Sequence, residues 1–211
     1  MTDASLTAEK LLQVSAVQLS PASPFAWASG WKSPIYCDNR KILSHPYVRD
    51  FFKSELCNVV FEHFPAAEAV AGVATAGIPW GAMVADQLKL PFVYVRPKPK
   101  EHGLGNQVEG SLLPHQKVVV LEDLISTGKS SFQVVQVLRS LGVQVAGIVS
   151  IFNYGFPEAG QLFESEGIKV LSLTDYPTLL TTASRQGVIT SQQEALLLKW
   201  SADPSKWQPV P

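Results

Sequence analysis

Two adjacent carboxylates, followed by a turn rich in hydroxyl groups and glycine, carry the most informative chemistry in this sequence. Glu122 and Asp123 come directly after the apolar run Val118–Leu121, and residues 126–130 read Ser-Thr-Gly-Lys-Ser. The apolar run predicts a buried central strand, and apolar residues at helical spacing predict a helix over 131–141. The residues between them would form a loop at the carboxyl end of the strand, which is where open α/β sheets bind ligands.

This loop offers two kinds of binding group. Consecutive backbone N–H groups and the positive end of a helix suit a phosphate. The carboxylates of Glu122 and Asp123 accept hydrogen bonds from hydroxyl groups such as those of a sugar. A phosphorylated sugar is the simplest ligand that needs both, and the alternative is a surface turn whose acids are merely solvated.

The end of the same stretch, Gly128-Lys129-Ser130, looks like the end of a nucleotide triphosphate-binding P-loop. That pattern requires a glycine five positions before its second glycine, and this sequence has Asp123 there. The sequence therefore does not fit a P-loop nucleotide triphosphatase.

Length and composition favour an enzyme-sized α/β domain. The chain has 211 residues, 46% of them hydrophobic, and a formal net charge of −1. This charge gives no overall attraction to nucleic acid or to an anionic membrane, so we expect neither as a partner. Cys37 and Cys57 are too few for a disulfide framework, and the first residues do not resemble a secretory signal. We expect a cytoplasmic protein with reduced thiols.

Alternating strand and helix patterns predict the fold class, an α/β fold with a mainly parallel central sheet flanked by helices. Strands are expected over 69–74, 92–95, 117–121, 145–152 and 168–173, and helices over 47–64, 78–88, 131–141 and 157–166. Residues 1–46, with a helix over 6–19 and short extended pieces, would form a small cap. Residues 47–175 would form the core, and residues 176–211 a helical tail packed on it.

A polar, glycine-rich segment, residues 96–110, lies between two of the expected strands. Loops of this length inside a compact domain are often functional lids. Its cations alternate, so an extended backbone would turn them all toward one side, where they could face a polyanion such as diphosphate: Arg96, Lys98, Lys100 and His102. The alternative is a solvated hairpin with incidental charges.

Three segments in order resemble a known enzyme family. The stretch 118–130 resembles the phosphoribosyl diphosphate (PRPP) signature of type I phosphoribosyltransferases. Residues 98–110 look like the mobile catalytic loop of orotate phosphoribosyltransferases, and residues 28–41 are similar to the segment that helps to hold orotate in that family. The similarity covers most of the chain, and the three motifs in this order identify it as a member of the orotate phosphoribosyltransferase family.

The resemblance implies a reaction and roles for matching residues. Orotate would displace diphosphate from PRPP with Mg2+, giving orotidine 5′-phosphate on the route to UMP. It implies a type I phosphoribosyltransferase fold with residues 1–46 as the base-binding cap and 97–110 as the mobile loop, and a homodimer with shared active sites. Lys100, His102 and Asp123 would be catalytic, Ser126 would contact orotate, and Mg2+ would be carried by PRPP or diphosphate without a direct protein ligand. The PRPP contacts would be Arg96, Lys100, His102, Glu122, Asp123, Leu124, Ile125, Ser126, Thr127, Gly128, Lys129 and Ser130.

Some positions depart from one branch of that family and leave alternatives open. Pro97 stands where a second loop lysine is found, so Lys98 would have to substitute for it, and Ala76 replaces a lysine of the diphosphate loop. Contacts to the carboxylate of orotate are also open, with Lys32 and Arg40 as candidates. Two rival functions remain: transfer to another base, and a noncatalytic regulator that binds PRPP or a nucleotide.

Overall fold

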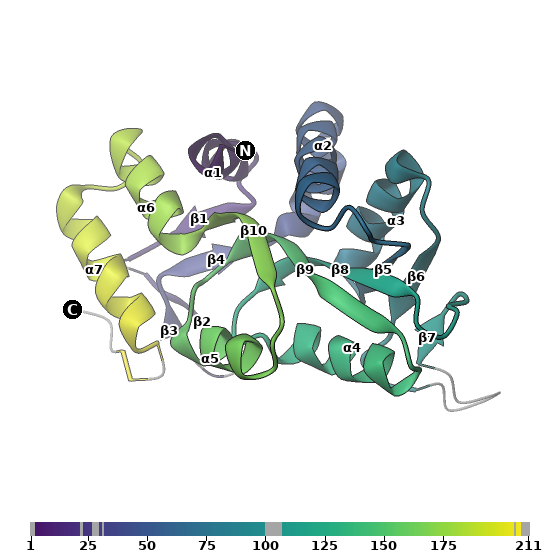
Figure 1. Cartoon of the computed structure of the whole chain (residues 1–211). Helices are drawn as coiled ribbons and strands as arrows, with labels where there is room; N and C mark the ends of the chain where they lie inside the picture. Colours follow the sequence, from purple (N-terminus) through teal and green to yellow (C-terminus); the bar gives the residue numbers. More distant parts are fainter. Residues whose placement is uncertain are drawn as a thin grey trace.

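A six-stranded sheet forms the centre of the molecule. The computed structural model describes residues 3–21, 23–26, 30, 32–99, 107–204 and 206–207. The strands lie in the order β10-β9-β8-β5-β6-β7, and all neighbours are parallel except β6 and β7 (Figure 1). Their bounds are β5 (Ala69–Val73), β6 (Phe92–Val95), β7 (Val108–Glu109), β8 (Lys117–Ile125), β9 (Gln144–Asn153) and β10 (Val170–Asp175). The predicted α/β fold with a mainly parallel sheet is confirmed.

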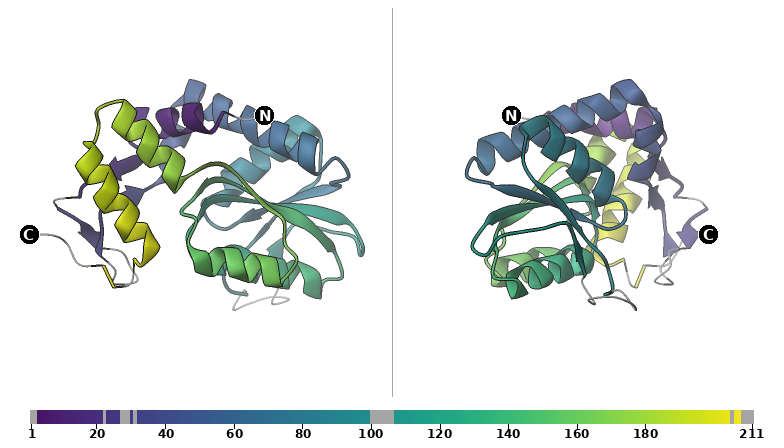
Figure 2. Two further views of the ribbon diagram at one scale, coloured as in Figure 1. Left: turned by 60° about the vertical axis from the view of Figure 1, so that its left-hand side comes forward. Right: turned by 90° about the vertical axis from the view of Figure 1, so that its right-hand side faces the viewer.

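Helices cover both faces of this sheet. On one face lie α1 (Ala4–Gln13), α2 (Pro46–His63) and α3 (Gly77–Leu88), and on the other α4 (Lys129–Ser140) and α5 (Pro157–Ser165) (Figures 1 and 2). Successive side chains of a strand point to opposite faces, so a strand covered on both sides must be apolar throughout. In β8, Val119 and Leu121 join one core cluster, and Val118 and Val120 join the other.

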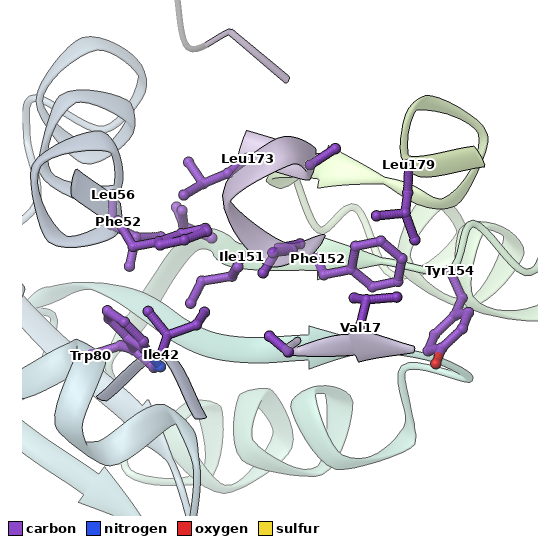
Figure 3. Close-up of a cluster of buried hydrophobic side chains, with 14 of the residues drawn as sticks. Val17, Ile42, Phe52, Leu56, Trp80, Ile151, Phe152, Tyr154, Leu173 and Leu179 are labelled. Carbon is purple, nitrogen blue, oxygen red and sulfur yellow. The ribbon is translucent and has the colours of Figure 1, made fainter. Parts of the chain in front are cut away.

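The larger core joins the sheet to elements outside it. Phe52 and Leu56 of α2 and Trp80 of α3 pack with Ile151 and with Ile42 of the 3-10 helix η1 (Asn39–Ser44) (Figure 3). Farther along, the rings of four aromatic residues lie with neighbouring centroids 5.2–6.0 Å apart: Tyr154, Phe156, Tyr176 and Trp200. Fully buried aromatic side chains contribute much of the hydrophobic stabilisation of such a core.

The two ends of the chain build one lobe beside the sheet. It contains β1 (Val17–Leu19) paired with β4 (Ile35–Cys37), β2 (Phe25–Ala26) paired with β3 (Lys32–Ser33), and the helices α6 (Tyr176–Arg185) and α7 (Ser191–Ala202) (Figure 2). Trp200 donates its indole N–H to the carbonyl of Lys32 at 3.2 Å. Arg185 pairs with Glu9 at 2.9 Å. The C-terminal helices therefore contact the N-terminal segment as well as the core.

Two expected boundaries differ from the structure by four residues or more. The predicted helix over 6–19 ends at Gln13, after which Ser15 has a φ of 53° and residues 17–19 become β1. Pairing with β4 supplies hydrogen bonds that a longer helix would have made internally. The predicted strand over 117–121 continues to Ile125, because β9 runs beside it as far as Asn153. Glu122 and Asp123 are therefore strand residues and not loop residues.

Within the part of the chain that the structure describes, no helix combines the length and the apolar character needed to cross a membrane.

Neighbouring leucines of α7 allow a matched test of this packing. Leu197 is fully buried in the larger core, whereas Leu198 is 44% exposed. We expect Leu197→Ala to lower the free energy of unfolding by about 2–5 kcal/mol, because it removes buried methyl groups and leaves a cavity. Leu198→Ala should cost under about 1 kcal/mol. Urea unfolding measures both, and equal losses would contradict the docking of α7 through Leu197.

Candidate active site

The acidic pair lies at a step in the sheet. β5 pairs with β8 as far as Gly72 opposite Leu121, whereas β9 stays paired with β8 up to Ile125. Beyond Leu121, β8 therefore has a neighbouring strand on one side only. The start of α3 crosses β8 at this level, since a Cβ on Gly77 would lie 2.5 Å from the carbonyl oxygen of Leu121. Only glycine permits this close approach.

Glu122 connects β8 to the helix that follows it. Its side chain is almost fully buried; Oε1 accepts a hydrogen bond from the backbone N–H of Asp123 at 3.0 Å, and Oε2 accepts one from the hydroxyl of Ser131 in α4 at 3.1 Å. Burial, and then the neighbouring charge of Asp123, raise the pKa of Glu122 well above its ordinary value. Glu122 therefore holds the strand, the turn and the first turn of α4 in one arrangement.

Asp123 is the more accessible acid of the pair. Its side chain is half-buried, and burial raises its pKa, while the hydrogen bond with Glu122 and the nearby guanidinium of Arg40 act in the opposite direction. Two interacting acids titrate as a pair. Burial raises the pKa of both acids, and that of Glu122 more strongly, so Glu122 takes up a proton before Asp123 does.

The turn after β8 is short and leads directly into α4. Ser126 and Thr127 are half-buried, and Gly128 has a φ of 76° and no side-chain cap. Its missing Cβ leaves room for Phe163 of α5, whose ring would otherwise lie 2.7 Å away. Helix α4 starts at Lys129, two residues earlier than expected, and the first N–H groups of a helix have no partner inside it. They form a site suited to an anion.

The two ends of the polar segment lie together beside α4. The N–H of Arg96 donates to the carbonyl of Gln107 at 2.9 Å, and the side-chain amide of Gln107 donates to the carbonyl of Arg96 at 2.7 Å. Arg96 also pairs with Glu109 at 3.8 Å, and Gln133 of α4 donates to the carbonyl of Pro97 at 3.0 Å. Lys98 is exposed, whereas Lys100 and His102 lie outside the described residues. The pairing of β7 with β6 was not predicted, because two residues in a polar stretch carry no strand pattern.

The N-terminal segment reaches the acidic pair from the other side. The side-chain amide of Asn39 donates to the backbone carbonyl of Asp123 at 2.6 Å. Next to it, Arg40 makes two hydrogen bonds to Asp38, at 2.6 Å and 3.1 Å, and this partner holds the pKa of Asp38 below its ordinary value. Sequence reasoning missed Asn39, because a contact between residues so far apart in the chain leaves no local pattern. It also missed the pair of Asp38 with Arg40, because two opposite charges at this spacing are common in surface loops.

A separate open groove lies beside α5 and does not contain the acids. It has a volume of about 450 Å³ and is lined mainly by apolar atoms of β9, β10 and α5, among them Phe156, Phe163 and Ile168. An apolar lining does not suit a polyanion, so charge and hydrogen bonding place the candidate active site at the carboxyl end of β8. Among the described residues, no three His, Cys, Asp or Glu side chains gather as metal ligands.

Comparison with known proteins agrees with this geometry. The phosphoribosyl transferase domain family matches residues 56–175, which include β8, the turn and α4. The chain is 53% identical over 203 residues to an orotate phosphoribosyltransferase of Bacteroides fragilis, covering 96% of each chain. It is 49% identical over 208 residues to one of Streptococcus pyogenes, covering 99% of this chain and 100% of the relative. The chain belongs to the orotate phosphoribosyltransferase family.

A solved structure from the same family has the same fold. The crystal structure of orotate phosphoribosyltransferase from Aeropyrum pernix is 34% identical, with a TM-score of 0.74, and the match covers 86% of this chain and 98% of the other. Family membership and the type I phosphoribosyltransferase fold, both expected from the three sequence segments, are confirmed. The roles of individual residues stay predictions.

The glycine of the turn provides a test of local packing. Gly128 and Gly142 have nearly equal φ values, 76° and 75°, but a Cβ on Gly142 would meet nothing within 4 Å. Both alanine variants carry the strain of a positive φ, and only Gly128→Ala also collides with Phe163. We expect Gly128→Ala to lose about 1–3 kcal/mol more unfolding free energy than Gly142→Ala. Equal losses in urea unfolding would show that the turn does not pack against α5.

The raised pKa of Glu122 predicts a pH dependence of stability. The folded protein holds a proton that the unfolded chain releases above its ordinary pKa, so this contribution is complete at low pH and is lost as the pH rises through the folded pKa. Gln at position 122 keeps an acceptor for Asp123 and cannot ionise. We expect the unfolding free energy of the wild type to fall relative to Glu122→Gln as the pH rises from about 4.5 toward neutrality. If the unfolding free energy of the wild type stayed constant or rose relative to that of Glu122→Gln over this range, the raised pKa of Glu122 would be contradicted.

Proposed function

We propose that this protein is an orotate phosphoribosyltransferase that transfers the phosphoribosyl group of PRPP to orotate in UMP biosynthesis. The products would be orotidine 5′-phosphate and diphosphate. The observation that carries the proposal is the acidic pair at the carboxyl end of β8, followed at once by the turn 126–128 and the N-terminus of α4. Relatives that bear this activity in their names match almost the whole chain, which supports the same substrates here.

The proposed chemistry needs electrostatics and positioning more than a nucleophile. When diphosphate leaves the anomeric carbon, positive charge develops on the ribose and negative charge on the leaving group. Asp123, the more accessible acid and the one whose pKa is raised less strongly, would accept hydrogen bonds from the ribose hydroxyls and favour the cationic ring. Glu122 would add a further contact, because the two bonds that it accepts do not use its whole hydrogen-bonding capacity.

The turn and the helix start would hold the 5′-phosphate. Backbone N–H groups at the start of a helix bind a phosphate without a cationic side chain. The proposed contacts run from Leu124 to Ser130, and of these residues Lys129 and Ser130 are exposed while Ser126 and Thr127 are half-buried. The hydroxyl of Ser126 is also our proposed contact to orotate.

Cations would surround the leaving diphosphate. Arg96 lies at the base of the segment that carries Lys98, Lys100 and His102, and its pairing with Glu109 would be exchanged for the stronger charge of diphosphate. We assign catalytic roles to Lys100 and His102 from the family motif. Closure of residues 97–110 over the substrates would exclude water from the reactive carbon.

The N-terminal segment, residues 1–46, would act as the base-binding cap over the core 47–175. Arg40 is a better candidate for the carboxylate of orotate than Lys32. Asp38 orients the guanidinium of Arg40. This guanidinium lies close enough to Asp123 to lower the pKa of that acid. Lys32 is exposed on β3, where its backbone pairs with β2 and its carbonyl accepts the bond from Trp200.

Magnesium fits this site as part of the substrate. Mg2+ in phosphate-binding sites takes most of its ligands from the phosphates and water and at most one or two from protein carboxylates. PRPP or diphosphate would carry the ion, so a dedicated protein cage is not required. When bound, Mg2+ would neutralise charge on the diphosphate.

We also propose a cytoplasmic location for the protein.

Turnover tests the function directly. Purified protein mixed with orotate, PRPP and Mg2+ should consume orotate and form orotidine 5′-phosphate and diphosphate, identified by mass spectrometry. Asp123→Asn should lower turnover by roughly 100-fold or more, since it removes charge stabilisation at the developing cation. Asp86→Asn, an exposed acid of α3 paired with Lys89, is the matched control and should stay active. Nucleotide formation from a purine base and not from orotate would show that the enzyme uses another base. PRPP binding without any turnover would favour a noncatalytic regulator.

Homodimers with shared active sites are part of the proposal. If the loop of one subunit completes the site of its partner, mixing inactive Lys100→Ala subunits with inactive Asp123→Asn subunits should restore up to about one quarter of the wild-type activity, because random pairing leaves one intact site in half of the dimers. Activity should be measured after the formation of mixed dimers has been verified by mass spectrometry. No recovery in those dimers would contradict shared sites.

A further inference from the structure

Asn39 is a fully buried polar residue with two described partners from different parts of the fold. Its exposed fraction is 0%, and it is the first residue of η1. Its side-chain N–H donates to the backbone carbonyl of Asp123 at 2.6 Å, across 84 positions of sequence. Its side-chain oxygen accepts a hydrogen bond from the thiol of Cys37 at 3.3 Å. The amide thus spans the distance between the N-terminal segment and the acidic pair.

The carbonyl that Asn39 contacts lies where the sheet has lost a strand. β5 stops pairing with β8 at Leu121, and α3 crosses β8 there through Gly77. Asp123 is two residues farther along, at a level where no strand flanks β8 on that side. A buried carbonyl without a donor is costly, and a side-chain amide that supplies the donor also fixes where the backbone lies.

The Asp123 carbonyl and the Cys37 thiol together determine which way the Asn39 amide points. The oxygen and nitrogen of an amide occupy nearly the same space, so the hydrogen-bond partners decide its orientation. A carbonyl only accepts, so the amide N–H groups must face Asp123, and the protonated thiol donates to the amide oxygen and reinforces this orientation. Burial, followed by the charges of Asp123 and Asp38, raises the pKa of Cys37 well above its ordinary value, so the thiol stays protonated at neutral pH.

We propose that Asn39 is a positioning residue for phosphoribosyl transfer: its amide, oriented by Cys37, holds the backbone of β8 so that the carboxylate of Asp123 meets the ribose. This inference rests on the proposed function and adds a residue to it. It also couples the two substrate regions, because Asn39 lies in the segment proposed to hold orotate and acts on the acid proposed to hold the sugar. A displacement of an ångström at a reacting group is enough to lower turnover strongly.

A purely structural role for Asn39 predicts a different result. Loss of a buried hydrogen bond would then lower stability without changing the kinetics of the protein that remains folded. Tyr176→Phe is the matched control. It removes one buried bond from a side chain to a backbone carbonyl, that of Leu197 at 3.1 Å, in a part of the lobe without a proposed catalytic role.

The decisive experiment compares Asn39→Ala, Cys37→Ala and the double variant with the wild type and Tyr176→Phe. Each is assayed for melting temperature, for kcat and for KM of both substrates. We expect Asn39→Ala to lower kcat/KM for PRPP by roughly tenfold or more, and Tyr176→Phe to lower the melting temperature while its kinetics stay unchanged. The double variant should be no worse than Asn39→Ala, because both changes break the same chain of hydrogen bonds.

Conservative variants and a binding measurement protect the test against misfolding. Cys37→Ser keeps a donor and should lose less activity than Cys37→Ala. Calorimetry of Mg2+-PRPP binding needs no turnover: the penalty of Asn39→Ala should shrink in an Asp123→Asn background, where the carboxylate that Asn39 positions is gone.

Unchanged kinetics in folded Asn39→Ala, or equal binding penalties in both backgrounds, would overturn the positioning role. Failure of the wild type to use orotate would refute the proposed function instead. The binding comparison would still decide the role of Asn39.

Discussion

Two adjacent carboxyl groups on a strand that extends beyond its neighbour impose the main constraint on this structure. Burying a carboxylate is unfavourable unless hydrogen-bond donors surround it or a proton neutralises it. Here the backbone N–H of Asp123 and the hydroxyl of Ser131 donate to Glu122, and burial raises the pKa of Glu122 well above its ordinary value. Asp123, whose pKa is raised less strongly, is the more accessible acid near the end of β8.

The surrounding elements serve the same end of the strand. Gly77 lets α3 cross the backbone of β8, Gly128 lets α5 pack under the turn, and Asn39 brings a donor from the N-terminal segment. Each position would tolerate few other residues, because two require the absence of a Cβ and one requires a donor of defined length. The two apolar cores on either side of the sheet hold these elements in place, and the polar groups are concentrated where the strands end.

Local patterns in the sequence predicted most of the fold. The apolar run of β8 and the helical spacing after it are strong signals, and the order of motifs was enough to recognise the family. The end of β8 was misjudged, because the strand continues through polar residues that are held by β9 and not by an apolar pattern. The helix expected to continue to Leu19 stops at Gln13, because β4 provides a pairing partner that lies far along the chain.

The candidate site could be predicted only in part for the same reason. Glu122, Asp123 and the turn 126–130 lie close together in the chain, so the sequence alone was enough to identify them. Asn39 becomes visible only when the N-terminal segment folds against β8. The engagement of Arg96 with Glu109 also depends on the pairing of β6 with β7, two residues long, for which the sequence has no signal.

A crystal structure of the protein with Mg2+ and PRPP would test the central claim most directly. The account predicts the 5′-phosphate on the backbone N–H groups of the turn 126–130, and the ribose hydroxyls within hydrogen-bond distance of the Asp123 carboxylate, with Asn39 still bonded to the Asp123 carbonyl. Phosphate density in the groove beside α5, with the end of β8 free of ligand, would contradict it.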